Sequence, residues 1–265
     1  MEFIYIKIAD FIIKATFKNS RQKDLYKQYK VDFSNYVSEF IVRRNTGTCD
    51  FYIEFEDQPY NVASDKRLLL AFDKKLKNKV TVYYQDYLTY KIILENVIYL
   101  LCSAHNGMII HSSAVAYKND AYLFTGPSGA GKSTIAELLS QDFTALSDDT
   151  SIVRRIDREY FLYQHPFVEK NRIYKSNKRY KLKGIYFIHK SKQFRLEKKS
   201  NKEDTFGKLL KQLTITDSEI VKNLLALSDT FRNVNSLYFP KDKSIIVESF
   251  KAITTKWQNT RLKRE

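Results

Sequence analysis

The segment Gly126-Pro-Ser-Gly-Ala-Gly-Lys-Ser133 constrains the fold of this chain more than any other feature. It fits the pattern G-x-x-x-x-G-K-[ST], in which the glycines let the backbone curl tightly. An apolar run at 121–125 precedes it, and residues 133–139 follow with apolar side chains at helical spacing. Strand, glycine loop and helix in this order are typical of α/β proteins. We therefore expect an α/β fold built around this loop.

Each residue type in the loop suits an anion site. The N–H groups of a curled glycine loop point inward at phosphate oxygens, and the N-terminus of the following helix attracts the same charge. Lys132 would neutralise the β- and γ-phosphates, and the Ser133 hydroxyl would be a ligand of Mg²⁺. We expect this loop to bind ATP with magnesium. The expected nucleotide-binding residues are Gly126, Pro127, Ser128, Gly129, Ala130, Gly131, Lys132, Ser133 and Thr134.

Two further polar features lie at informative distances from the loop. His111 stands 15 residues before Gly126, on an expected strand (108–111) that should run beside the strand leading into the loop. Asp148 and Asp149 end the strand that follows the loop helix, so their carboxylates should emerge at the edge that holds the phosphates. Alone, an Asp-Asp pair is more often a solvated turn and a histidine more often structural. Their joint placement around the loop favours a catalytic site.

In order and spacing, these features resemble the HPr kinase family, P-loop kinases that share a fold with phosphoenolpyruvate carboxykinase. The similarity covers about residues 105–195 and includes Phe167 and the run 182–188. It implies a P-loop kinase core with a mixed sheet.

The resemblance also implies roles for the site residues. Asp148 would be the general base for an acceptor hydroxyl, and Asp149 would hold Mg²⁺ together with Ser133. His111 would lie near the γ-phosphate and the acidic pair, and Lys132 would balance the charge that develops during transfer.

The chain departs from that family in two respects. HPr kinases that also remove phosphate carry a second, Arg- and Gly-rich signature near the C-terminus, and this sequence has none. Its first 85 residues resemble no domain that we can name. The chain looks closer to stand-alone HPr-kinase-like proteins, some of which phosphorylate a serine of peptide natural-product precursors such as lasso peptides.

The implied activity is an ATP-dependent kinase that acts on a hydroxyl, most simply a Ser or Thr of a peptide or protein. A small-molecule or nucleic-acid kinase, and an ATP-gated binding module without phosphate transfer, remain alternatives. The loop also resembles that of ABC transporter ATPases. That family needs a glycine-rich signature further along the chain, and only Gly184 and Gly207 follow Gly131.

The N-terminal third has a different pattern from the rest. Runs at 3–8, 51–55 and 80–84 are short and rich in β-branched and aromatic residues, which indicates strands. From about residue 86 the apolar spacing becomes helical. We expect a small β-rich companion domain at 1–85 and a kinase-like domain at 86–265 that opens with a helix at about 86–104.

The expected elements of the second domain follow from periodicity and from helix-end signals. Strands are expected at 108–111, 114–117, 121–125, 151–155, 160–164, 184–189 and 244–248, and helices at 133–139, 205–213 and 218–227.

The net charge of +15 is unevenly distributed. Residues 131–265 hold 28 Lys and Arg against 16 Asp and Glu, and the run 170–199 holds 12 basic residues with the single acid Glu197. Such a surface suits an acidic peptide, a nucleic acid or phosphate groups, although solvated lysines on strand edges give the same composition. Candidates for contacting the transition state or for binding an acidic acceptor are Arg154, Arg155, Arg172 and Arg179.

No membrane partner is expected. The N-terminus carries Glu2, Lys7 and Asp10, unlike a signal peptide, and the longest apolar stretch (92–104) is too short to span a bilayer. Cys49 and Cys102 lack metal-like spacing and are expected to be ordinary thiols of a reducing compartment. We expect a soluble, cytoplasmic protein whose oligomeric state the sequence leaves open.

Overall fold

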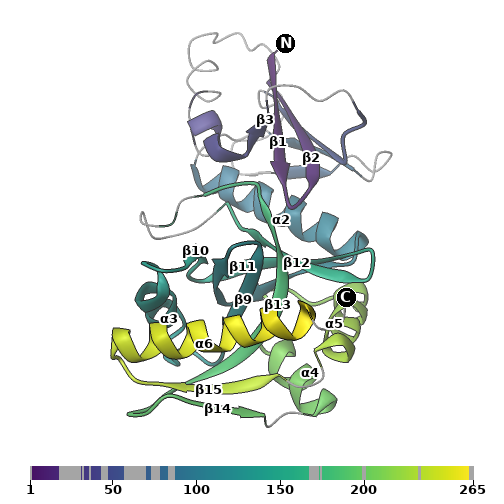
Figure 1. Cartoon of the computed structure of the whole chain (residues 1–265). Coiled ribbons are helices and arrows are strands. Elements are labelled where there is room, and N and C mark those ends of the chain that lie inside the picture. The colour runs from purple at the N-terminus through teal and green to yellow at the C-terminus, as the bar shows by residue number, and fades with distance from the viewer. Residues whose placement is uncertain are drawn as a thin grey trace. The chain divides into compact units, whose positions relative to one another are not determined.

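A computed structural model describes residues 2–17, 31, 33–35, 37–42, 47–56, 70–72, 78–82, 87–166, 173, 175–198, 201–231 and 234–262. The chain forms two compact units, Met1–Leu101 and Cys102–Glu265 (Figure 1). The expected domain boundary lies between residues 85 and 86. Phe167, Arg172 and part of the basic run 170–199 lie outside the described residues.

The first unit contains a six-stranded mixed sheet in the order β3-β1-β2-β4-β6-β5. Its strands are β1 (Glu2–Ile8), β2 (Phe11–Phe17), β3 (Ile41–Val42), β4 (Phe51–Phe55), β5 (Leu70–Phe72) and β6 (Lys79–Val82), with a 3-10 turn, η1, at Ser38–Phe40. Neighbouring β1 and β2 are antiparallel, whereas β2–β4 and β4–β6 are parallel. Strand β2, which was not predicted, lies at the centre of this sheet.

Alternating apolar residues give this sheet one buried face. Aromatic rings from β2, β4 and the 31–35 segment meet there, with Phe17 and Phe55 stacked at 4.9 Å and Phe33 edge-on to Phe55 at 5.1 Å. Helix α2 (Tyr87–Ala104) adds Tyr90, whose ring lies 5.0 Å from that of Phe33. Burial along α2 recurs at helical spacing and ends shortly before Asn106, whose φ of 55° marks the turn.

The second unit is built on a nine-stranded mixed sheet whose main path runs β10-β8-β9-β13-β12-β11-β7, with β15 beside β13 and β14 beside β15. Its strands are β7 (Gly107–His111), β8 (Ser113–Tyr117), β9 (Asp120–Thr125), β10 (Thr144–Ser147), β11 (Thr150–Ile156), β12 (Glu159–Gln164), β13 (Arg179–Lys190), β14 (Arg195–Lys198) and β15 (Asn235–Phe239). Its helices are α3 (Lys132–Leu139), α4 (Lys202–Leu210), α5 (Ser218–Thr230) and α6 (Lys243–Leu262). The pairs β9–β13 and β13–β15 are parallel, and the others are antiparallel.

Helices α3 and α6 cover one face of this sheet, and Figure 1 shows α6 (yellow) crossing in front of the strands with α3 beside one end. The centre of the core is the fully buried ring of Phe250 on α6. It lies 5.3 Å from Tyr122, 5.4 Å from Phe124 and 5.5 Å from Tyr186, measured between ring centroids. Packing around Phe250 therefore holds α6 against the central strands β9 and β13.

The strand expected at 244–248 is wrong, because these residues form the first turns of α6. A short β-branched run fits a strand or a buried helix equally well. Here Asp242 caps the helix: its Oδ1 accepts from the N–H of Ile245 at 3.2 Å. Burial of Ile246, Val247 and Phe250 then follows helical spacing. Strands β14 and β15 were not predicted, and β13 begins five residues before the strand expected at 184–189. The other predicted strands and helices of this unit are present, with differences of up to three residues at their ends.

Replacing Phe250 with alanine should lower the free energy of unfolding by about 3–5 kcal/mol, the usual cost of removing a buried aromatic ring. Urea denaturation followed by circular dichroism measures it. The matched control is Ile245→Ala on the same helix, where the side chain is 42% exposed and the loss should stay below about 1 kcal/mol. Equal losses for both variants would contradict this packing of α6.

No helix in the described part of the chain is long and apolar enough to cross a membrane.

Candidate functional site

The glycine-rich segment forms a loop between the end of β9 at Thr125 and the start of α3 at Lys132. Gly129 and Gly131 have φ angles of 76° and 101°, in the region that disfavours side chains. Gly131 is the N-cap of α3, and its carbonyl accepts from the N–H of Ile135 at 2.9 Å. The loop therefore ends at the positive end of a helix, where anions bind well.

Gly131 also allows a close approach of β15. A Cβ placed on it would lie 2.9 Å from Cζ of Phe239, closer than carbon atoms approach without displacement.

Gly131→Ala should therefore cost about 1–3 kcal/mol of stability through clash and backbone strain. Thermal or urea unfolding measures this loss, and Gly207→Ala in α4 is the control. No atom lies within 4 Å of a Cβ at Gly207, so there alanine should stabilise by about 0.5–1 kcal/mol. Unchanged stability of Gly131→Ala would contradict the loop geometry.

Lys132 lies beneath the loop with only 8% of its surface exposed. Its Nζ donates to the carbonyl oxygens of Gly126 at 2.9 Å and Pro127 at 3.3 Å. Burial lowers the pKa of this ammonium, and the nearby charge of Asp149 partly offsets the shift. Its backbone carbonyl accepts from the hydroxyl of Ser113 at 2.6 Å, which fixes the start of α3 against β8. The loop thus has a buried cation held by neutral carbonyls.

His111 and Asp149 form a pair with 3.1 Å between Nδ1 and Oδ1, and the charge of Asp149 acts on the nearby Lys132. Both side chains are accessible, at 41% and 48% exposure. Backbone contacts fix the pair: the N–H of His111 donates to Gln212 at 2.7 Å, and the carbonyl of Asp149 accepts from Ser112 at 2.8 Å. The hydroxyl of Thr125, which precedes the loop, donates to the carbonyl of His111 at 3.2 Å. These contacts join the ends of β7, β9 and β10.

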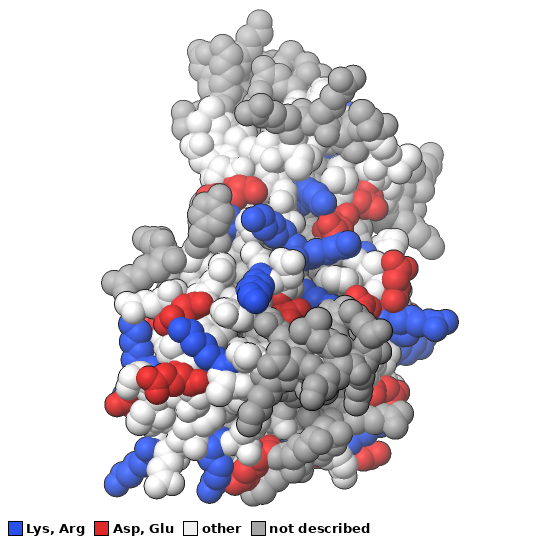
Figure 2. Space-filling model, in the orientation of Figure 1, with Lys and Arg blue, Asp and Glu red and all other residues white. Residues whose placement is uncertain are grey.

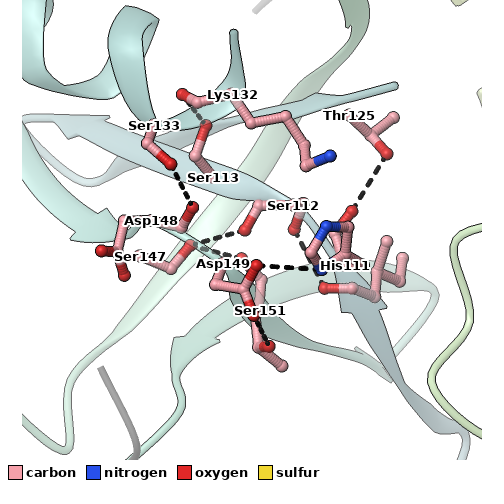
Figure 3. A network of polar contacts seen from close by, with 12 residues as sticks. His111, Ser112, Ser113, Thr125, Lys132, Ser133, Ser147, Asp148, Asp149 and Ser151 are labelled. Carbon is pink, nitrogen blue, oxygen red and sulfur yellow. Dashed lines mark hydrogen bonds and ion pairs between the residues drawn. The ribbon is translucent and has the colours of Figure 1, made fainter. Parts of the chain in front are cut away.

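Asp148 is placed differently from its neighbour. Its side chain is buried, at 6% exposure, and Figure 3 shows the carboxyl group directed away from Lys132 and from the His111–Asp149 pair. Its backbone carbonyl accepts from the hydroxyl of Ser133 at 3.2 Å. A register shift between Ala145 and Ser147 interrupts β10 just before the two aspartates. Such an irregularity re-aims the side chains that follow it. The structure therefore brings His111, Asp149, Lys132 and Ser133 together but turns the Asp148 carboxyl elsewhere.

The expectation that the strand of His111 runs beside β9 is wrong. Strand β7 pairs with β11, and the neighbours of β9 are β8 and β13. Only Ser112 separates β7 from β8, so the chain passes almost directly from one to the other. Strand β8 takes the place next to β9, and the end of β7 still reaches Thr125 because it joins β8 there. His111 is therefore near the loop for a different reason from the one expected.

Three candidate arginines lie away from the loop. Arg154 pairs with Gly107, at the end of β7 opposite His111, and the N–H of the neighbouring Arg155 donates to Asn106. Arg179 begins β13, whose other end approaches the loop, and its guanidinium lies 4.8 Å from the ring of Phe161. None of these three reaches the site, so the structure gives no support to a role for them in phosphate transfer.

No feature of the sequence indicated Gln212, whose backbone carbonyl accepts from the N–H of His111. Any residue type can make a backbone contact of this kind, so no pattern in the sequence predicts it.

Part of the basic charge is paired with acids. Lys183 lies 3.9 Å from Asp120, Lys181 contacts Glu159, and Arg195 lies 2.7 Å from Glu197. On the face shown in Figure 2, basic and acidic side chains alternate over the described surface. Charge alone therefore singles out no partner-binding surface on this face.

Among the described residues, no group of three or more His, Cys, Asp or Glu side chains could hold a metal ion.

The second unit is thus a mixed α/β structure in which a glycine loop and a His–Asp pair share one edge of the sheet. A family model described as the SynChlorMet cassette protein ScmC matches residues 84–208 of this chain, which is a little less than half of it. The matched range includes His111, the loop and both aspartates. The name of this family states no reaction.

Among solved structures, the HPr(Ser) kinase/phosphatase from Coxiella burnetii is similar at 14% identity, covering 59% of this chain and 97% of that chain. The TM-score of 0.31 is too low to support any argument about fold or activity. No curated protein matches the chain.

Proposed function

We propose that this chain is an ATP-dependent kinase that transfers the γ-phosphate to a hydroxyl, most simply of a Ser or Thr in a peptide or protein. The observation that carries the proposal is the position of the accessible His111–Asp149 pair beside the buried Lys132 of the glycine loop. The glycines, Lys132 and the helix N-terminus are enough to bind phosphate, whereas an accessible carboxylate held by a histidine can also act on an acceptor. A kinase needs one to position and deprotonate its acceptor.

The loop suits the phosphates of ATP. Its left-handed glycines, the N-terminus of α3 and the Lys132 ammonium supply dipoles and charge to one anion site. Because burial lowers the pKa of Lys132, an arriving phosphate would stabilise its charged form. Residues 126–134 are the proposed nucleotide-binding segment.

A magnesium ion fits the same place. Mg²⁺ is usually held by one or two carboxylates and hydroxyls together with phosphate oxygens and water. Ser133 lies in the first turn of α3, and its hydroxyl is next to the Asp148–Asp149 segment. This hydroxyl is the proposed protein ligand, with phosphate oxygens and water at the remaining positions. When bound, the ion would neutralise charge on the β- and γ-phosphates.

The geometry favours Asp149 over Asp148 as the base, in contrast to the roles that the family resemblance implies. The Asp149 carboxylate is accessible and its orientation is fixed by His111, whereas that of Asp148 is buried and directed elsewhere. In the proposed reaction, the acceptor oxygen forms a bond to the γ-phosphorus and the bond to the β–γ bridging oxygen breaks. ADP leaves, and the hydroxyl proton passes to Asp149.

Incubation with [γ-³²P]ATP, Mg²⁺ and an array of Ser- and Thr-containing peptides tests the proposal, with alanine-substituted peptides as controls. The array should span acidic and basic sequences, since charge on the face shown in Figure 2 selects neither. Mg²⁺-dependent labelling of hydroxyl peptides, and not of their alanine versions, is the expected result. Release of label only as free phosphate would favour an ATP-gated binding module.

A further inference from the structure

A second lysine, Lys190, lies beside the glycine loop on its outer side. Strand β13 runs parallel to β9 with Phe187 opposite Thr125, so β13 continues three residues past the point where β9 gives way to the loop. The backbone of this extension follows the loop closely: a Cβ on Gly126 would lie 3.4 Å from the carbonyl oxygen of Ile188. Lys190 is the last residue of the strand.

The side chain of Lys190 reaches the start of α3. A Cβ built on Gly131 would lie 3.6 Å from Cε of Lys190, and the ammonium is one bond beyond that atom. The backbone here is fixed, because Lys190 pairs with Phe239 of β15 and the N–H of Ser191 donates to the carbonyl of Phe239 at 2.9 Å. The first turn of α3 is the part of the loop where exposed N–H groups and the helix dipole attract an anion.

The charge of Lys190 is not matched by a carboxylate within the described structure. Two other lysines of β13 differ in this respect, since Lys181 contacts Glu159 and Lys183 lies 3.9 Å from Asp120. Lys190 is solvent-exposed, so its ammonium can move towards an arriving ligand at little cost. An unmatched cation beside an anion site strengthens that site.

We propose that Lys190 is a second phosphate-binding lysine, which contacts the phosphate chain of the nucleotide from outside the loop while Lys132 contacts it from beneath. This inference rests on the proposed function, because it requires that the loop bind a nucleotide. It assigns Lys190 to ATP affinity and positioning, with the proton transfer left to Asp149. A phosphate chain held between two lysines is fixed in orientation as well as in place.

Isothermal titration of the full chain with MgATP tests the inference at low and moderate salt. Lys190→Gln should raise the dissociation constant about tenfold, as expected for one charge-assisted hydrogen bond, and should make binding less dependent on salt. Lys190→Arg keeps the charge and should stay within about threefold of the wild type. The matched control is Lys183→Gln, the same change on the same strand beside β9 residue Asp120, at the opposite end from the loop, and it should bind as the wild type does.

The outcomes separate this inference from the proposed function. If the wild type binds MgATP and Lys190→Gln binds it equally well, Lys190 is not a phosphate ligand, while the kinase proposal stands. The same holds if Lys190→Gln and Lys183→Gln weaken binding equally. If the wild type binds no MgATP, the proposed function itself is contradicted. Circular dichroism of each variant shows whether it is folded.

Discussion

Replacing Lys132 with methionine is expected to weaken MgATP binding about a hundredfold or more, with almost no loss of stability. Methionine has nearly the same length and fills the same buried space. The ammonium that it replaces contacts only carbonyl oxygens of the loop, at 2.9 Å and 3.3 Å, so folding gains little from its charge. Removing the buried cation that contacts a bound phosphate lowers the binding free energy by about 2–5 kcal/mol.

Calorimetric titration with MgATP and urea unfolding together measure these two effects. The control is Lys251→Met on α6, where the lysine is an exposed partner of Asp142 and no effect on nucleotide binding is expected. A Lys132→Met variant that binds MgATP like the wild type would show that the loop is not a nucleotide site. If that variant unfolds, Gly131→Ala addresses the same question, because its Cβ would lie 2.9 Å from Cζ of Phe239 and would displace the backbone at the end of the loop.

Replacing Asp149 with asparagine is expected to lower kcat about a thousandfold while the dissociation constant of MgATP changes less than about threefold. Loss of a general base typically costs a factor of 10²–10⁴. Asparagine keeps the size and one hydrogen-bonding oxygen, so the contact with His111 can persist. The measurement is single-turnover transfer from ATP to an acceptor found in the peptide array.

The paired variant Asp148→Asn decides between the two aspartates. Its buried carboxyl points away from the loop, and we expect a smaller change in kcat, accompanied by some loss of stability. The opposite pattern would restore the roles implied by the family resemblance. In that case, Asp148→Asn would abolish transfer with ATP affinity intact, and Asp149→Asn would raise the Mg²⁺ concentration required.

The loop and the ends of most elements around it could be predicted from the sequence because local residue types determine them. Glycines with positive φ, a lysine and a serine at fixed spacing define the loop wherever it stands in the fold. The strands leading to it show alternating or continuous apolar patterns. Local chemistry also identified His111 and the two aspartates as polar residues at strand ends.

The remaining features depend on contacts between distant segments. The direction of each aspartate side chain depends on the register shift in β10. The residue types in this segment do not predict that shift. Strand β7 lies at one end of the sheet path because β8 occupies the place beside β9. Lys190 reaches the loop only because β13 extends beyond β9 in a parallel pairing. The sequence shows the run 170–199 as basic, and the fold then pairs Lys181 and Lys183 with acids and brings Lys190 to the site.

The most direct test of the kinase proposal is the stoichiometry of the reaction with a responsive acceptor peptide. Phosphorylated peptide and ADP would be quantified in the same samples, for the wild type and for Lys132→Met and Asp149→Asn. The proposal predicts one phosphorylated peptide for each ADP in the wild type, and almost none of either in the variants. ADP accompanied only by free phosphate, or full transfer by Asp149→Asn and Lys132→Met, would contradict it.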